Sequence, residues 1–157
     1  MSASDDAYAD PWDAFRQRVV AAMAEVVAGD PSSFLVTQGP VIQIDPGPGL
    51  LGRKRKPRSV RAEVLALPLE EDGFIFVRSV FCDPGAKDFP VDAHARRAMR
   101  SAGWQVPEDP GYFSLADHYF TAKVATGDHR RVADLAARTY PILGVTDPEQ
   151  VEMKVEA

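Results

Sequence analysis

The stretch from Gly47 to Gly52, Gly-Pro-Gly-Leu-Leu-Gly, carries the glycine spacing with which dinucleotide-binding enzymes approach a pyrophosphate. That chemistry requires a helix that begins at the last glycine, because the amide groups and the dipole of its first turn hold the phosphates. The stretch follows an apolar run, Val41 to Asp45, that has the composition of a strand. The residues after Gly52 therefore decide whether a nucleotide site exists.

The residues after Gly52 are unfavourable for a helix. Pro57 would enter the interior of such a helix, where proline costs about 3 kcal/mol relative to alanine. A Walker-type phosphate loop is also excluded. Arg53 occupies the position of its lysine, and Lys54 occupies the position of its serine or threonine. We interpret residues 47–52 as a loop and expect no nucleotide cofactor. The alternative is a small-molecule or nucleotide-responsive regulatory domain, or an enzyme, that uses this loop. Four consecutive cations follow Gly52: Arg53, Lys54, Arg55 and Lys56.

A thiol nucleophile is the second chemistry that the sequence offers. His118 beside Asp117 could orient a base for Cys82, the single cysteine. Cys82 ends an apolar run, however, where a buried structural thiol is common. The other two histidines, His94 and His129, show no metal-ligand spacing with Cys82 or with each other. We therefore expect no catalytic residue, no metal and no cofactor, and a protein that is not an enzyme.

Binding of another polypeptide remains as a use for the charged and aromatic residues. A run of cations is most often a solvated surface, and contact with an acidic partner segment is its second interpretation. Aromatic residues belong mostly to the core, and those left exposed would line an apolar groove for a peptide or a partner helix. The predicted partner-binding residues are Arg53, Lys54, Arg55, Lys56, Phe74, Phe76, Trp104, Tyr112 and Phe113.

Composition sets the broad class. The chain has 157 residues, 45% hydrophobic and 26% charged, which suits one globular domain. A net charge of -5 argues against a dedicated nucleic-acid binder. One cysteine, no signal-peptide pattern and no apolar run of about 18 residues lead us to expect a cytoplasmic protein without a membrane span.

The elements that position these residues begin with a helix. Residues 1–9 are polar and are expected to be disordered, and residues 10–157 are expected to form one α+β domain. Asp10 as a cap, Pro11 in the first turn and Gly29 as a stop predict an amphipathic helix. Its apolar residues recur at helical spacing: Trp12, Phe15, Val19, Met23 and Val26.

Short apolar runs then predict an antiparallel sheet. Residues 34–37 and 41–44 flank Gln38-Gly39-Pro40 and indicate a hairpin. Residues 60–65 alternate like a half-exposed strand, and residues 74–77 resume after the acidic turn 70–73. The aromatic segment from Tyr112 to Val124 indicates a further strand or two. Connections too short for crossover helices make the sheet antiparallel.

Two more helices are expected. Residues 90–102 predict a modest helix that Gly103 ends, with Trp104 folding back on its last turn. Asp128 caps a final long helix, which Pro141 kinks or ends near Tyr140, and a short last helix starts at Asp147. The predicted fold is a twisted antiparallel sheet of about five strands packed against N-terminal, middle and C-terminal helices.

This layout resembles the TY-Chap domain, a group similar to YbjN proteins and type III secretion chaperones. The resemblance covers roughly residues 10–151, and Ala102 stands where family members tend to carry leucine. It implies a chaperone-like module that binds a segment of a partner protein, performs no chemistry, and is linked to secretion and to homodimers in related proteins. It depends on the Trp12 helix, Val41-Ile42-Gln43, Arg61-Ala62-Glu63-Val64, Gly103-Trp104, Pro107, Ala133, Leu135-Ala136, Arg138-Thr139 and Gly144-Val145.

Overall fold

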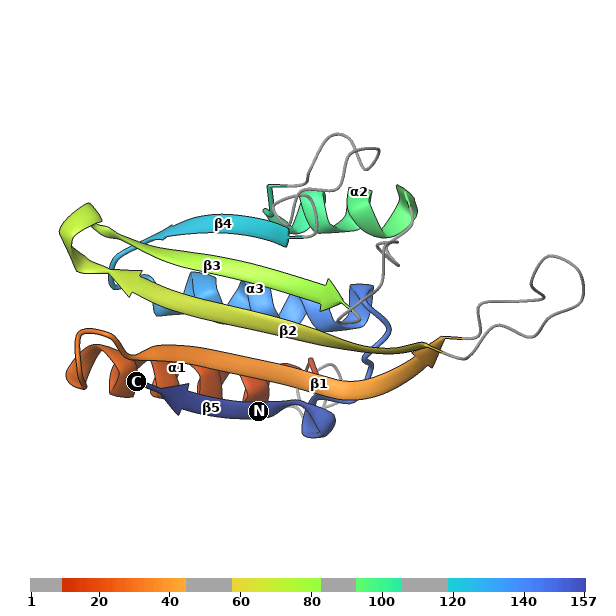
Figure 1. Cartoon of the computed structure of the whole chain (residues 1–157), viewed down its shortest axis with the longest axis horizontal. Helices are drawn as coiled ribbons and strands as arrows, with labels where there is room; N and C mark the ends of the chain where they lie inside the picture. Colours follow the sequence, from red (N-terminus) through yellow and green to blue (C-terminus); the bar gives the residue numbers. More distant parts are fainter. Residues whose placement is uncertain (1–9, 45–57, 83–92, 106–118) are drawn as a thin grey trace, which may run out of the picture.

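A computed structural model describes residues 10–44, 58–82, 93–105 and 119–157. Three helices and a five-stranded sheet form an α+β fold, as predicted (Figure 1). The elements, in chain order, are α1 (Asp13–Ala28), β1 (Phe34–Ile44), β2 (Arg58–Leu69), η3 (Glu70–Asp72), β3 (Phe74–Cys82), α2 (Ala93–Ala102), β4 (Tyr119–Ala125), α3 (His129–Ile142), η5 (Pro148–Gln150) and β5 (Glu152–Glu156).

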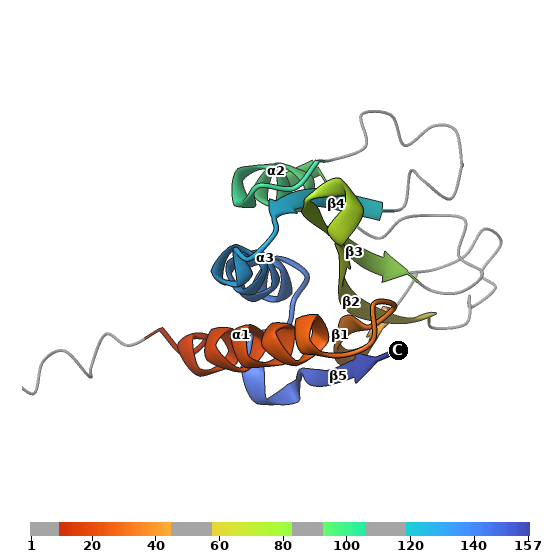
Figure 2. The same cartoon turned by 90° about the vertical axis from the view of Figure 1, so that its left-hand side faces the viewer.

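The sheet has the strand order β4-β3-β2-β1-β5, and every neighbouring pair is antiparallel. All three helices lie on one face of the sheet, with α3 between α1 and α2 (Figure 2). We call the other face, which no described helix covers, the open face. The predicted N-terminal segment, residues 1–9, lies outside the described residues, and the single domain over residues 10–157 stays a prediction.

Helix α1 forms as its apolar spacing predicts. Its buried residues include Phe15, Val19 and Met23, which face the sheet and α3. The carboxylate of Asp10 accepts a hydrogen bond from the Trp12 amide at 2.9 Å and thereby orders the turn that leads into the helix. The first helical residue is Asp13, three positions after the predicted cap.

The hairpin predicted over residues 34–44 is wrong. These residues form one continuous strand, β1, which pairs with β2 from Leu35–Ala66 to Ile44–Arg58. The pairing register shifts between Gln38 and Val41, so Gly39 and Pro40 form a bulge within the strand. A Cβ at Gly39 would lie 3.2 Å from Val145 and 3.3 Å from the Tyr140 ring, which explains the glycine at this position.

The short helix predicted from Asp147 is limited to the 3-10 turn Pro148–Gln150, and it leads into a strand that the sequence did not reveal. This strand, β5, pairs with β1 from Phe34–Glu156 to Gln38–Glu152. It becomes one edge of the sheet, while β4 is the other edge.

Helices α2 and α3 end as their sequences require. Gly103 follows α2 with a φ of 113°, and the Trp104 amide donates to the Met99 carbonyl at 3.1 Å, which is the predicted fold-back. The Asp128 carboxylate caps α3 by accepting from the Arg131 amide at 3.2 Å. Pro141 stands inside the last turn of α3, and the helix ends one residue later.

Candidate functional site

The open face of the sheet carries apolar side chains, as the helix-covered face does. On β2 the helix-covered side chains, Ala62, Val64 and Ala66, are at most 3% exposed. The alternate residues Leu65 and Leu67 point to the open face because successive side chains of a strand point to opposite faces, and both are half-buried. Strand β2 is therefore apolar on both faces over its second half.

The register of the sheet joins apolar residues from three strands into one surface. Leu67 pairs with Phe76, and Val36 pairs with Leu65. Val36 is 8% exposed, and the remaining members of the surface are half-buried. We call this surface the sheet patch, and its members are Phe34, Val36, Leu65, Leu67, Leu69, Phe74 and Phe76.

Cations and carboxylates border the sheet patch. At the β4 side, Lys123 pairs with Phe76 in the ladder, and its ammonium lies 4.9 Å from the centre of the Phe74 ring. At the β5 side, Lys154 pairs with Val36 and Glu156 pairs with Phe34. An apolar ligand on the patch would therefore meet a cation at the β4 edge and charges of both signs at the β5 edge.

Beyond the patch, the open face becomes polar and internally paired. The Gln38 amide donates to the Glu63 carboxylate at 2.8 Å. Arg61 donates through Nε to the Gly39 carbonyl at 2.6 Å and pairs through Nη2 with Glu152 at 3.2 Å. These bonds tie β1, β2 and β5 together, and they mark the end of the apolar surface.

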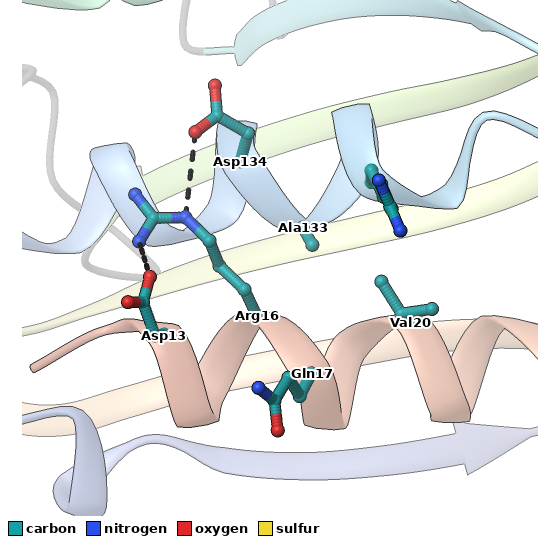
Figure 3. A pocket seen from close by; sticks show the side chains of 7 residues that line it. Asp13, Arg16, Gln17, Val20, Ala133 and Asp134 are labelled. Carbon is teal, nitrogen blue, oxygen red and sulfur yellow. Dashed lines mark hydrogen bonds and ion pairs between the residues drawn. The ribbon is translucent and has the colours of Figure 1, made fainter. Parts of the chain in front are cut away.

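A groove of about 590 Å³ lies on the opposite side of the molecule, between α1 and α3. Arg16 pairs there with Asp13 at 3.1 Å and with Asp134 at 3.5 Å (Figure 3). Arg16 also holds Asp10 at 2.7 Å; the Trp12 amide and the Arg16 guanidinium together lower the pKa of the Asp10 carboxyl. Arg16 and its carboxylate partners therefore satisfy one another and stabilise the helix pair.

A second groove of about 570 Å³ lies between α2 and the C-terminal half of α3. Small or apolar side chains such as Ala98, Ala102 and Ala137 line it, with Arg138 at its border. Arg138 pairs with Asp134 at 3.0 Å. Among the described residues that line the two grooves, none is a nucleophile with an adjacent base.

The described residues contain no group of three or more His, Cys, Asp or Glu side chains that could hold a metal ion. In the same ranges, no helix is long and apolar enough to cross a membrane.

The predicted partner-binding residues do not form one site. Phe74 and Phe76 lie together in the sheet patch. Trp104 is 3% exposed and belongs to the core, where its indole N–H donates to the Thr139 hydroxyl at 2.8 Å. The cations Arg53, Lys54, Arg55 and Lys56, the aromatics Tyr112 and Phe113, and the loop 47–52 lie outside the described residues.

Sequence reasoning missed most of the patch, namely Phe34, Val36 and the leucines of β2. The signal was present in Leu65, the last residue of the predicted strand, and in Leu67 and Leu69 beyond it, which place apolar residues on the face that should have been polar. Phe34 and Val36 gave no such signal, because residues 34–36 are all apolar and the sequence does not distinguish the two faces of this strand.

These features define an α+β fold in which helices cover one face of an antiparallel sheet and the other face is partly apolar. The family model for TY-Chap3, described as "T3SS (YopN, CesT) and YbjN peptide-binding chaperone 3", matches residues 5–156. The chain belongs to this family of peptide-binding chaperones, and the predicted resemblance is confirmed. Neither the search of curated proteins nor the search of solved structures returned a match.

Proposed function

We propose that this protein is a non-enzymatic, chaperone-like module that holds a segment of a partner protein on the sheet patch. The observation that carries the proposal is the row of half-buried Phe and Leu side chains on the face without a described helix. The family description supports a peptide ligand. A homodimer and a link to secretion are expectations that follow from the family resemblance, and a cytoplasmic location is an expectation from the cysteine count and the lack of a signal-peptide pattern.

Burial of apolar surface would drive the binding. At about 25 cal/mol per Å², a partner that covers roughly 300 Å² of the patch would gain about 7.5 kcal/mol before the costs of association. Loss of motion and ordering of the segment consume much of that gain. The bound segment must therefore present several apolar side chains on one face.

The paired residues of the patch lie side by side across the strands, Val36 on β1 with Leu65 on β2, and Leu67 on β2 with Phe76 on β3. Successive strands are about 4.8 Å apart, and an extended chain repeats its side chains on one face about every 6.6 Å. A segment with alternating apolar and polar residues can thus place its apolar face along or across these paired residues. An amphipathic helix would also present one apolar face.

Fluorescence anisotropy with a synthetic peptide tests the proposal. The probe is a labelled peptide of about ten residues that alternates leucine and serine. The double variant Leu67→Ser/Phe76→Ser should bind at least about tenfold more weakly, because each buried apolar side chain contributes about 1.5 to 3 kcal/mol. The control Val41→Ser changes a 60% exposed valine on β1 outside the patch and should leave the affinity unchanged.

Circular dichroism and urea unfolding must show that both variants are folded. Equal affinity in the double variant and in the wild type would contradict the assignment of the patch, and a folded wild type that binds no such peptide would contradict the function. ATP and NAD test the alternative function, since a nucleotide at about 100 times its Kd adds about 2.7 kcal/mol of stability. Such a stabilisation would favour a nucleotide-responsive domain.

A further inference from the structure

Helix α2 carries three arginines and no acidic residue in its ten positions. Met99 and Ala102 are buried against the rest of the molecule, whereas Arg97 and Arg100 are exposed. The third arginine, Arg96, is half-buried. The solvent side of α2 is therefore an arginine face formed by Arg96, Arg97 and Arg100.

Within the described part of the chain, no ion pair or hydrogen bond engages these three guanidinium groups. Three other arginines do form ion pairs. Arg16 on α1 and Arg131 and Arg138 on α3 all pair with Asp134. The arginine face is thus a concentration of positive charge that the described residues leave unbalanced, on a chain whose net charge is -5.

This charge pattern opposes the stability of its own helix. Arg96 and Arg100 stand four positions apart, and like charges at that spacing destabilise a helix. Only Arg100, in the last turn, gains from the negative end of the helix dipole. Features that break a local rule of this kind are expected where function requires them.

Carboxylates are the ligands that fit the arginine face. A planar guanidinium binds a carboxylate through two parallel hydrogen bonds, which makes arginine better suited than lysine to this contact. Nucleic acid fits less well, because binding to a phosphate backbone draws on many cationic contacts and three arginines would neutralise about three phosphates. The net charge of -5 would also repel a long polyanion.

Helix α2 lies near the β4 edge of the sheet on the helix-covered side, whereas the sheet patch lies on the open face. Gln105, three residues after α2, pairs with Thr121 of β4, and both views of the molecule show α2 beside β4 (Figures 1 and 2). Lys123, two residues after Thr121, already places a cation at the patch border. A partner chain that leaves the sheet patch must therefore pass around the edge strand β4 to meet the arginine face on the other side of the sheet.

We propose that the arginine face of α2 binds acidic residues that flank the apolar segment of the partner. The inference rests on the proposed function, and it adds a chemical class to the partner: an apolar stretch followed by Asp or Glu.

Two labelled peptides test it by fluorescence anisotropy at low salt. Both contain the same alternating leucine-serine segment; one ends in four glutamates and the other in four glutamines. Wild-type protein should bind the glutamate-tailed peptide about three- to tenfold more tightly, and about 0.5 M NaCl should remove the difference because salt screens exposed charges.

The double variant Arg97→Gln/Arg100→Gln should lose the preference and still bind the glutamine-tailed peptide with wild-type affinity. The matched control Arg18→Gln/Arg130→Gln removes two exposed cations that lie away from α2 and from the sheet patch, on α1 and α3, and should keep the preference. Failure of wild-type protein to bind the glutamine-tailed peptide would contradict the proposed function; equal binding of both peptides would contradict only the present inference.

Two further measurements distinguish other occupants. In the free protein, Arg97→Gln, which leaves the contact of Arg100 with the helix dipole in place, should raise or preserve the melting temperature, because it removes like-charge repulsion. A clear decrease would show that the chain's own carboxylates already engage the arginines, which would overturn the proposal. Tight binding of an oligothymidylate that the double variant loses, without a preference for the glutamate tail, would assign the face to nucleic acid instead.

Discussion

At the scale of single residues, the helix layer is anchored to the sheet by a buried polar contact. The hydroxyls of Thr37 on β1 and Tyr140 on α3 lie 2.6 Å apart, and the Thr37 hydroxyl also lies 3.3 Å from the Val64 carbonyl. The Tyr140 ring stacks on Trp12 with centroids 6.0 Å apart and meets Phe15 edge-on at 5.9 Å. One tyrosine thus joins α1, α3 and the sheet.

Replacing Tyr140 with phenylalanine isolates the polar part of this contact. Tyr140→Phe keeps the ring contacts and removes one buried hydrogen bond, so the free energy of unfolding should fall by about 1 kcal/mol. Urea unfolding at pH 7 measures the loss. Thr37→Val is the reciprocal control, and the double variant should lose less than the sum of the two single losses, because both remove the same bond. Strict additivity would show that the two hydroxyls do not interact.

The same variant tests the ionisation of Tyr140. Burial raises the pKa of this phenol far above the ordinary value of 10.0. The unfolded chain therefore releases the Tyr140 proton first, and stability is lost as pH rises above about 10, by up to about 1.4 kcal/mol per pH unit. Tyr140→Phe lacks this loss, so its deficit relative to the wild type should shrink between pH 9 and pH 11 in urea titrations. A deficit that stays constant would contradict the raised pKa.

At the scale of elements, the helices were predictable and two strands were not. Local signals decide a helix: the apolar spacing of α1, the Asp128 cap and Gly103 all act within a few residues. Gly39 and Pro40 resemble a turn locally, and only their packing against α3 and Val145 makes them a bulge. Strand β5 is five residues long and mostly charged, so its own sequence does not favour a strand. It forms because it pairs with β1, more than 100 residues away in the chain.

A matched pair of substitutions tests the predicted face of α1. Met23 is fully buried, whereas Val27, one turn later on the same helix, is 47% exposed. Met23→Ala should cost about 2 to 5 kcal/mol, because it removes buried contacts and leaves a cavity. Val27→Ala should change stability by less than about 0.5 kcal/mol. Urea unfolding of both variants measures the difference, and similar losses would mean that α1 is rotated about its axis.

At the scale of the whole molecule, the two faces of the sheet differ, because described helices cover only one of them. The sheet patch takes residues from β1, β2 and β3, so it exists only once the strands pair; the sequence could indicate Phe74 and Phe76 as a pair but could not join them to Phe34. Trp104 was predicted to bind a partner but is buried. The sequence did not indicate that its indole would donate a hydrogen bond to Thr139 on α3.

The charges on the edge strand β5 affect association between molecules. Strand β1 contains no charged residue in its eleven positions, and strand β5 covers the first five of them with a strand that carries Glu152, Lys154 and Glu156. Charged residues on an edge strand oppose pairing between molecules, whereas a long uncharged edge invites it. Strand β5 therefore protects β1 from association as well as adding contacts to the fold.

Deletion of residues 152–157 tests this role of β5. The shortened chain should form soluble oligomers or aggregates, because β1 then becomes an uncharged edge, and light scattering coupled to size exclusion measures them. The variant Glu152→Gln/Lys154→Gln/Glu156→Gln keeps the strand and removes its charges, so it should remain paired with β1 and associate less than the deletion does. If the deletion variant showed the same mass and the same urea midpoint as the full chain, β1 would need no cover, and the protective role of β5 would be disproved.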